Sequence, residues 1–563
     1  MSRLLYNICR RSCESWCLRK TRSWTDEANK SLPRCGWLIG GSWICQQSRG
    51  FKTHPNKFGF HSLNAKRSKV WLWGLGAGLV LALGLKEDAD LAWGSEHKRK
   101  TPDDEEKNKA KKYASAIEIS RDLLQRIKVQ DEVAAPGIVV GVSVDGTQVW
   151  AEGLGYADLE NRVRCRPETV MRIASISKPL TTATVARLWE QGRLDLDAPV
   201  QKYVPEFPEK EFKGEAVAIT TRMLLSHLSG IRHYEKDAKK VKEEKEKANR
   251  ALKQQRAAAA EDKALGSQEV HPKDRKNGGR EPSSRGNDST KSTKDAKQAA
   301  KKEFEQEEYY LKEKFDSVIQ ALDLFKNDPL IFKPGSSFLY STHAFTLLSA
   351  VVERAAGRPF LDHMMKMFRE LGMLNTVPEE NDRIIYNRSR FYHFNKKGRI
   401  VNCPYVDNSY KWAGGGFLST VGDLLVFGNA MLYSYQMAHV KDGRGLLPGY
   451  LKPETAKAMW TPVDGTEGSW DKDGQYAMGW LVVEEQQQFG QCRKRRHYVS
   501  HTGGAVGASS VLLVLPFNLA QSEGQTLAPP QGIVVTIISN MQSAGLNSTA
   551  LKIALQFEKA RNA

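Results

Sequence analysis

The chain has 563 residues and a formal net charge of +19, a length that fits one large enzyme domain with additional segments. The basic excess is local: residues 1–69 hold 14 Lys and Arg against 3 Asp and Glu, and residues 235–302 hold 20 against 12. The rest of the chain carries 50 residues of each sign, so the composition argues against a nucleic-acid-binding protein.

The N-terminal region is expected to be a targeting region. Residues 1–69 are rich in Arg, Ser and Trp and poor in acids, which is typical of a mitochondrial transit peptide. The next 16 residues, 70–85, are uncharged but fall short of the ~20 residues that usually cross a bilayer. Two interpretations of this hydrophobic segment stay open: it contacts the inner membrane, or it is a targeting element that is removed after import. Residues 86–112, where a basic run precedes an acidic one, are expected to form a polar linker.

The remaining residues, 113–563, are predicted to form one α+β domain. A helical pattern begins near Tyr113, and apolar runs at 137–144 and 148–151 flank Asp145-Gly146, a strong β-hairpin signal. The later elements follow in chain order: helices at 179–191 and 221–228, strands at 477–484, 498–501, 509–515 and 532–539, and a last helix at 548–559. Because strands stand at both ends of a mainly helical middle, both ends of the domain are expected to share one antiparallel sheet.

A charged low-complexity insertion interrupts this domain at residues 235–302. It is rich in Lys, Glu, Ala, Gln and Ser, and it has almost no large apolar residues. Such a composition buries too little surface to offset the entropy lost on ordering. We therefore expect a solvated surface insertion, and an arm that binds a partner is the alternative.

Metal and disulfide sites are not expected. Five of the eight cysteines lie within residues 1–69, which leaves Cys165, Cys403 and Cys492 for the domain. Neither a C-x-x-C pair nor a metal-ligand spacing accompanies these three thiols, so buried inert thiols are the favoured interpretation. The sequence therefore predicts neither a metal nor a cofactor.

The candidate nucleophile is Ser175, which stands at the start of an apolar helix and three residues before Lys178. Residues three apart share one face of a helix, so the amine can reach the hydroxyl. A serine needs a base within hydrogen-bond reach, and a lysine can be that base only where burial lowers its pKa. The same S-x-x-K spacing occurs at Ser95 and Ser469 without a following apolar helix. The spacing alone is therefore weak, and the helix that follows favours Ser175.

Two further motifs are candidates for the same site. Tyr340 stands at the entry to a helical apolar stretch, where its phenol could relay a proton with the lysine; an ordinary half-buried tyrosine is the alternative. His501-Thr502-Gly503-Gly504 lies between two strand-like runs, and its small residues would let a substrate lie against the strand edge. The N–H groups of Gly504 and Ser175 would then form an oxyanion hole. His501 would hold an anionic substrate group or assist proton transfer, and a turn residue is the alternative.

In this order, the three motifs resemble the boxes of the serine β-lactamase and DD-peptidase superfamily: S-x-x-K, then Y-x-N or S-x-N, then K-T-G or H-T-G. Ser175 and Lys178 match the first box, Tyr340 begins the second, and His501 to Gly503 match the third in the form of the peptidase S12-like and class C-like branch. Similar phrases stand at 195–200, 224–230 and 413–420, and the resemblance covers roughly 113–234 and 303–560. It implies a β-lactamase/transpeptidase-like fold and a serine hydrolase that forms an acyl-enzyme.

The second box departs from the family at Thr342, where the family usually has Asn. Asn offers a donor and an acceptor to a substrate amide, whereas Thr is shorter and offers only a hydroxyl. We therefore expect peptide or ester turnover to exceed β-lactam turnover, with acylation of Ser175 retained. A lipase-like site is disfavoured, because the chain has no G-x-S-x-G motif.

Together with its N-terminal region, the chain resembles a mitochondrial branch of this family in vertebrates. That resemblance implies a serine protease of the intermembrane space that acts on peptide or protein substrates. It also implies a homo-oligomer or filament, association with the inner membrane, and an influence on mitochondrial lipid metabolism. The competing hypothesis is a filament-forming scaffold that keeps the fold with little catalysis, and three boxes in order favour the enzyme.

Overall fold

The computed structural model describes residues 102–129, 134–237, 239–241, 243, 307–440, 445–468, 470–487, 494–519, 521–522, 525–526 and 528–563. The predicted transit peptide 1–69, the hydrophobic segment 70–85 and nearly all of the insertion 235–302 lie outside the described residues. Among the helices that are described, none has the length and the apolar run that crossing a bilayer requires.

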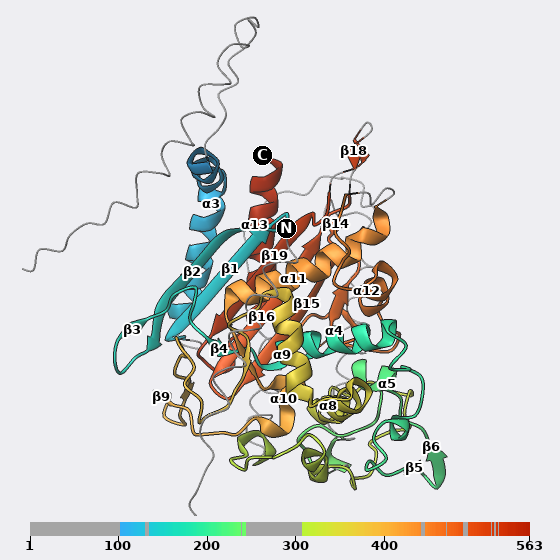
Figure 1. Ribbon diagram of the computed structural model, residues 1–563. Helices are drawn as coiled ribbons and strands as arrows, with labels where there is room; N and C mark the ends of the chain where they lie inside the picture. Colours follow the sequence, from blue (N-terminus) through green and yellow to red (C-terminus); the bar gives the residue numbers. More distant parts are fainter. Residues whose placement is uncertain are drawn as a thin grey trace, which may run out of the picture. The chain divides into compact units, whose positions relative to one another are not determined.

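An eight-stranded antiparallel sheet forms the centre of the domain (Figure 1). Its strands, in spatial order, are β11 (Gln475–Tyr476), β12 (Leu481–Val483), β15 (Tyr498–Ala505), β16 (Ala508–Pro516), β19 (Gly532–Ser539), β1 (Gly137–Val144), β2 (Thr147–Asp158) and β3 (Val163–Arg164). β1 comes from the start of the domain and β19 from its end, and the two pair directly, with Ile138 opposite Ser539. The prediction that both ends share one antiparallel sheet is therefore confirmed.

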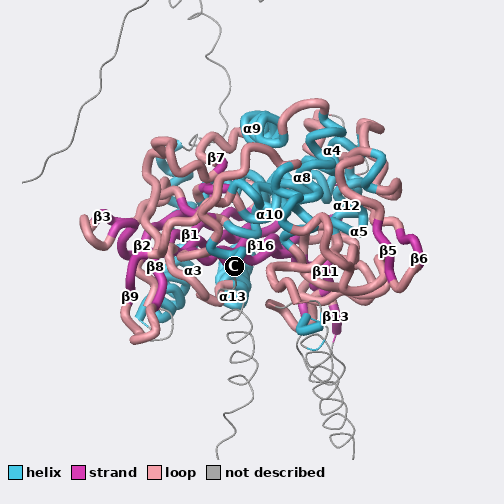
Figure 2. Tube along the Cα trace, turned by 90° about the horizontal axis from the view of Figure 1, so that it is seen from below, coloured by secondary structure: helices cyan, strands magenta, loops and turns pink. Residues whose placement is uncertain are grey.

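Helices cover both faces of this sheet, and Figure 2 shows the strands between the two groups. One face is covered by α3 (Pro102–Val129) and α13 (Asn547–Asn562), where the rings of Tyr113 and Phe557 stack with centroids 5.7 Å apart. The other face is covered by the helices of the middle: α4 (Ser177–Glu190), α5 (Thr221–Leu225), α8 (Thr342–Ala356), α9 (Phe360–Leu371), α10 (Trp412–Gly415), α11 (Val421–Gln436) and α12 (Pro453–Met459). This arrangement confirms the α+β class.

Strands β1 and β19 are apolar at most positions because both faces of the sheet are covered there. Successive side chains of a strand point to opposite faces of the sheet, and all eight residues of β19 are buried. Val534 and Ile538 belong to the core beneath the middle helices, whereas Val535 and Ile537 belong to the core beneath α3 and α13. The sheet is thus a layer packed on both faces, and β15 lies within it.

Short elements complete the fold. The remaining sheets are formed by β4 (Met171–Arg172), β10 (Phe417–Ser419) and β7 (Val377–Pro378), and by the pairs β5 (Lys210–Phe212) with β6 (Glu215–Val217), β8 (Tyr392–Phe394) with β9 (Ile400–Asn402), β13 (Gln486–Gln487) with β14 (Lys494–Arg495), and β17 (Gln521–Ser522) with β18 (Gln525–Thr526). The 3-10 helices are η1 (Ala174–Ile176), η2 (Val200–Lys202), η3 (Glu307–Tyr310), η4 (Gln320–Leu324), η5 (Ser409–Lys411) and η6 (Met437–His439). Because β4 pairs with β10, the segment that leads to η1 lies beside the one that follows α10.

Several boundaries differ from the sequence prediction, and two of the differences change the assignment of a segment. Helix α3 begins at Pro102, so residues 102–112, expected in the polar linker, are helical; proline followed by acids is a typical helix start. The run 477–484, expected as one strand, is divided, because a turn that includes Gly479 (φ 74°) separates β11 from β12.

Candidate active site

Ser175 lies in η1, a single 3-10 turn that leads directly into α4. The sequence predicted the first turn of the helix, and the structure gives that turn the tighter 3-10 form. Ala174 has a φ of 48°, a left-handed conformation that is unfavourable for a residue with a Cβ, and it packs against Ala505 and Ala508 of the sheet. Ser175 is partly exposed, whereas Ala174 and Ile176 on either side are buried.

Lys178 is fully buried, and its amine lies 3.1 Å from the Ser175 hydroxyl. The amine also donates to the backbone oxygen of Gly414 at 2.7 Å and to the hydroxyl of Thr342 at 3.4 Å. A neutral amine has two hydrogens and one lone pair, so it could donate to these two oxygens and keep its lone pair for the serine proton. Burial disfavours the charged form of an amine, which is the condition that a lysine base requires.

A close approach between Gly414 and Thr342 fixes one side of the surroundings of Lys178. A Cβ added to Gly414 would lie 2.7 Å from Cγ2 of Thr342, so only glycine fits there. Thr342 is the first residue of α8 and is 4% exposed. Its side chain therefore lies against Lys178 and Gly414 and is largely withdrawn from solvent.

Tyr340 lies beside the lysine, with its ring centroid 4.8 Å from the amine of Lys178. It is half-buried and precedes α8 by two residues. Its ring centroid is 4.3 Å from that of His227 and 6.3 Å from that of His501. The fold thus brings the predicted Tyr340 and His501 to the same place as the Ser175–Lys178 pair.

His501 is fully buried, and both of its ring nitrogens have partners. Nδ1 lies 2.6 Å from the carbonyl oxygen of Thr502, and Nε2 lies 2.9 Å from the hydroxyl of Tyr476. A carbonyl oxygen can only accept, so Nδ1 is assigned the hydrogen and Nε2 accepts from Tyr476. Burial lowers the pKa of His501 to about 3, so the ring is neutral at neutral pH. In this structure both ring nitrogens are engaged and the ring is neutral, so a part for His501 in holding an anionic substrate group stays a prediction.

The segment Thr502-Gly503-Gly504 lies within β15, not between two strands as the sequence suggested, because pairing with β16 continues to Ala505. A Cβ on Gly503 would collide with the backbone oxygen of Ile173, so β15 can lie against η1 only with glycine at this position. Gly504 is exposed, whereas Gly503 and Ala505 are buried. The accessible backbone of β15 therefore lies next to the turn that carries Ser175.

Three aromatic residues at the site were not predicted from the sequence: His227, Trp470 and Tyr476. His227 stands in the family-like phrase 224–230, which was its only signal. Its Nδ1 accepts a hydrogen bond from the backbone N–H of Ser341 at 3.1 Å, and its Nε2 has no hydrogen-bond partner among the described residues. Burial holds the pKa of His227 well below its usual range. The ring of Trp470 packs against His501 with centroids 4.9 Å apart, so the site has an aromatic wall.

The remaining sequence candidates lie partly outside the described residues. Ser95, Ser469 and Cys492 lie outside the described residues. Within the described parts of the chain, no group of His, Cys, Asp and Glu side chains could hold a metal ion. Cys165 is buried and Cys403 is partly buried; burial raises the pKa of Cys403 to about 12, which disfavours its thiolate.

Comparison with known proteins gives the family. Residues 126–269 and 288–556 match the family described as Beta-lactamase. The mitochondrial serine beta-lactamase-like protein LACTB of Mus musculus is 62% identical over 482 residues, which is 85% of each chain. The Homo sapiens protein of the same name is 64% identical over 451 residues, which is 80% of this chain and 81% of that protein.

Two solved structures share the fold. The octameric penicillin-binding protein homologue from Pyrococcus abyssi is 20% identical, with a TM-score of 0.51 over 79% of this chain and 77% of that one. EstCE1, a hydrolase with promiscuous acyltransferase activity, is 20% identical, with a TM-score of 0.52 over 80% of this chain and 99% of that one. These similarities confirm the β-lactamase/transpeptidase-like fold predicted from the three motifs. With the family match over most of its length and relatives that align along most of theirs, the chain belongs to the β-lactamase family.

Proposed function

We propose that this protein is a serine hydrolase that forms an acyl-enzyme on Ser175 and that its substrates are peptides or proteins. The observation that carries the proposal is the 3.1 Å separation between the Ser175 hydroxyl and the amine of the fully buried Lys178. Membership of the β-lactamase family supports hydrolysis. The choice of peptides over β-lactams is supported by the side chains around this pair.

In the proposed reaction, the amine of Lys178 accepts the hydroxyl proton as Oγ of Ser175 bonds to the substrate carbonyl carbon. The carbonyl oxygen becomes an oxyanion, for which the N–H groups of Ser175 and Gly504 are the proposed donors. The carbon–nitrogen or carbon–oxygen bond then breaks, and the leaving group takes the proton from Lys178 with the assistance of Tyr340. Water attacks the acyl-enzyme in the same way, which releases a carboxylic acid and restores Ser175.

The third box is proposed to bind the substrate through backbone and shape. Thr502 and Gly503 would line the strand edge along which the substrate lies, as the small residues of the motif suggest. His501 is neutral and hydrogen-bonded to Tyr476. We therefore propose that it orients the Tyr476 hydroxyl and supplies no charge to the substrate. A substrate that depends on a cationic partner at this position would gain nothing from His501.

Thr342 bears on the choice of substrate. Its hydroxyl accepts from Lys178 at 3.4 Å and its side chain is almost entirely buried. It cannot offer a substrate amide the donor and acceptor that Asn carries. This supports the expected order in which peptides and esters are turned over faster than β-lactams. Measuring all three substrate classes on one preparation tests the order, and a preparation that hydrolyses penicillins best would overturn it.

Labelling with a fluorophosphonate probe tests the nucleophile. Ser175→Ala is expected to abolish labelling, because no other hydroxyl would receive the phosphonyl group. Ser336→Ala is the matched control, since Ser336 is exposed in a turn where its hydroxyl donates to the Lys333 carbonyl at 2.6 Å. The control should label like the unsubstituted protein. Retained labelling of Ser175→Ala would refute the proposal.

The cellular setting is proposed from the relatives. The mouse and human relatives are named as mitochondrial, which supports a mitochondrial location for this chain, and we propose the intermembrane space with inner-membrane association and an influence on lipid metabolism. A fold neighbour is octameric, which supports a homo-oligomer or filament. Light scattering on the purified protein tests assembly. If Ser175→Ala leaves the cellular effect intact while assembly-defective variants lose it, the scaffold hypothesis replaces the enzyme.

A further inference from the structure

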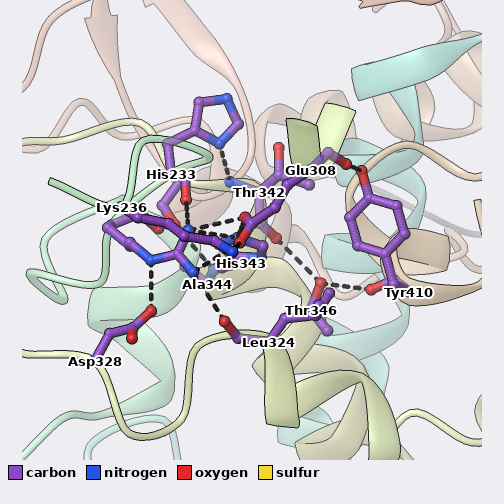
Figure 3. A network of polar contacts seen from close by, with 12 residues as sticks. His233, Lys236, Glu308, Leu324, Asp328, Thr342, His343, Ala344, Thr346 and Tyr410 are labelled. Atoms are coloured by element: carbon purple, nitrogen blue, oxygen red, sulfur yellow. Dashed lines mark hydrogen bonds and ion pairs between the residues drawn. The ribbon is translucent and has the colours of Figure 1, made fainter. Parts of the chain in front are cut away.

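A cluster of buried charges lies at the N-terminus of α8, outside the reacting groups (Figure 3). The side chains of Arg232 and Glu308 are 2% and 3% exposed, and they form two hydrogen bonds of 2.8 and 3.0 Å. His343, in the first turn of α8, is fully buried and lies 2.8 Å from Glu308. Arg232 and Glu308 are 76 residues apart in the chain, with the insertion between them, so the pair joins the two segments that flank it.

Arg232 is held in a single orientation. A guanidinium has five N–H donors, and each has an acceptor here. Two donate to Glu308, one donates to Oδ2 of Asp328 at 2.5 Å, and the other two donate to the backbone oxygens of His233 and Leu324, both at 2.8 Å. Because all five N–H groups of the Arg232 guanidinium have acceptors, the side chain cannot rotate without losing buried hydrogen bonds.

His343 has a defined tautomer in this cluster. The Glu308 carboxylate can only accept, so Nε2 of His343 carries the hydrogen and donates to it. Burial lowers the pKa of His343 to about 4, so the ring is neutral at neutral pH. The ring of Phe325 stacks on it with centroids 4.6 Å apart. Glu308 thereby fixes the rotation of a side chain in the first turn of α8.

The same cluster holds the backbone that carries the second box. The hydroxyl of Ser341 donates to the carbonyl oxygen of Arg232 at 2.7 Å, and the N–H of Thr342 donates to Nδ1 of His233 at 3.2 Å. Tyr340 directly precedes these residues, and the hydroxyl of Thr342 is 3.4 Å from Lys178. A shift of Arg232 would therefore move the groups that contact the lysine.

We propose that Glu308 and Arg232 are positioning residues for acyl transfer: their ion pair sets the place of Tyr340 and Thr342 against Lys178. This inference rests on the proposed function of Ser175. A buried ion pair is weak as a source of stability, because desolvation opposes the attraction. Its effect on geometry is stronger, since a small misplacement of reacting groups costs large factors in rate.

Substitutions of two carboxylates that accept hydrogen bonds from the Arg232 guanidinium test the proposal. Glu308→Gln puts an amide where Arg232 and His343 need an acceptor, so one donor must face another donor. Asp328→Asn is the matched control. Asp328 also accepts a hydrogen bond from Arg232, but its side chain is 38% exposed and this bond does not involve His343. Two constants are measured with a fluorophosphonate probe: kinact, the rate constant of covalent labelling, and KI, the probe concentration that gives half of the maximal labelling rate. The melting temperature of each variant is measured as well.

We expect Glu308→Gln to lower kinact by about 10-fold or more with KI changed by less than about 2-fold, since the altered step is proton transfer. Asp328→Asn should stay within about 2-fold of the unsubstituted protein in both constants. Unchanged kinact in folded Glu308→Gln, or an equal loss in Asp328→Asn, would overturn the proposal. A purely structural role would lower the melting temperature and leave kinact of the folded protein intact.

A milder variant decides the case if Glu308→Gln does not fold. The hydroxyl of Tyr410 donates to the backbone oxygen of Glu308 at 2.7 Å, so Tyr410→Phe loosens this anchor and keeps the ring. A smaller fall in kinact at constant KI supports the proposal, and an unchanged kinact contradicts it. If the unsubstituted protein takes up no label at Ser175, the proposed function itself fails, which is a separate outcome.

Discussion

Burial determines how the polar side chains of the site behave. Lys178 and His501 are both fully buried, yet their surroundings differ. The ring of His501 has one acceptor and one donor as partners, which suits a neutral imidazole. The amine of Lys178 contacts three uncharged oxygens, which suits its proposed role as a base.

The charge state of Lys178 leads to a prediction. Lys178→Arg places a group there that stays protonated, so it cannot accept the Ser175 proton, and acylation should slow by ~100-fold or more. Lys210→Arg is the control, because Lys210 is also buried and donates to backbone oxygens, including that of Asp328 at 3.0 Å. Probe labelling rates per folded molecule provide the measurement. Wild-type labelling of Lys178→Arg would show that another group is the base.

At the level of elements, the first turn of α8 carries a residue of the site, and residues from distant parts of the chain hold it in place. Ser341 is the N-cap of α8, where its hydroxyl accepts from the N–H of Ala344 at 3.1 Å and donates to the backbone carbonyl oxygen of Arg232. Thr342 then follows within the first turn. The sequence indicated an apolar helix after Tyr340, but the second hydrogen bond of the cap joins Ser341 to Arg232, which is 109 residues away in the chain.

Removing this cap should cost more than removing an ordinary one. Ser341→Ala loses two hydrogen bonds, so the free energy of unfolding should fall by about 2 kcal/mol. Thr420→Ala is the comparison, because Thr420 caps α11 with a single bond to the N–H of Asp423 at 3.2 Å, and it should cost about 1 kcal/mol. Urea unfolding measures both. Equal losses would mean that the bond from Ser341 to Arg232 contributes nothing to stability.

At the scale of the whole molecule, several histidines are buried in their neutral form. Burial lowers the pKa of His343 to about 4 and that of His501 to about 3, from a usual 6.5. The unfolded chain therefore binds protons on these rings at a higher pH than the folded chain does. The stability that they contribute is present above pH 6.5 and is lost as the pH falls from there toward the folded pKa values.

We expect these two rings to lower the free energy of unfolding by about 3 kcal/mol between pH 7.5 and 5.5, at ~1.4 kcal/mol each. His227 and His363, whose pKa values burial also lowers, add to this drop. Urea titrations at the two pH values measure the drop. His343→Gln should reduce it by ~1.4 kcal/mol, whereas His439→Gln should leave it unchanged, because His439 is exposed. A stability that is the same at both pH values would contradict the assignment of neutral buried rings.

The sequence by itself determined the sheet at both ends of the domain, the middle helices and the pairing of Ser175 with Lys178. These features depend on local periodicity and on the three-residue spacing of a helix, which act over a few residues. Only the tertiary structure decided that His501 is neutral, that Gly503 lies against Ile173, and that Glu308 and Arg232 meet. Such contacts join residues far apart in the chain, and burial sets their protonation, so no local pattern carries them.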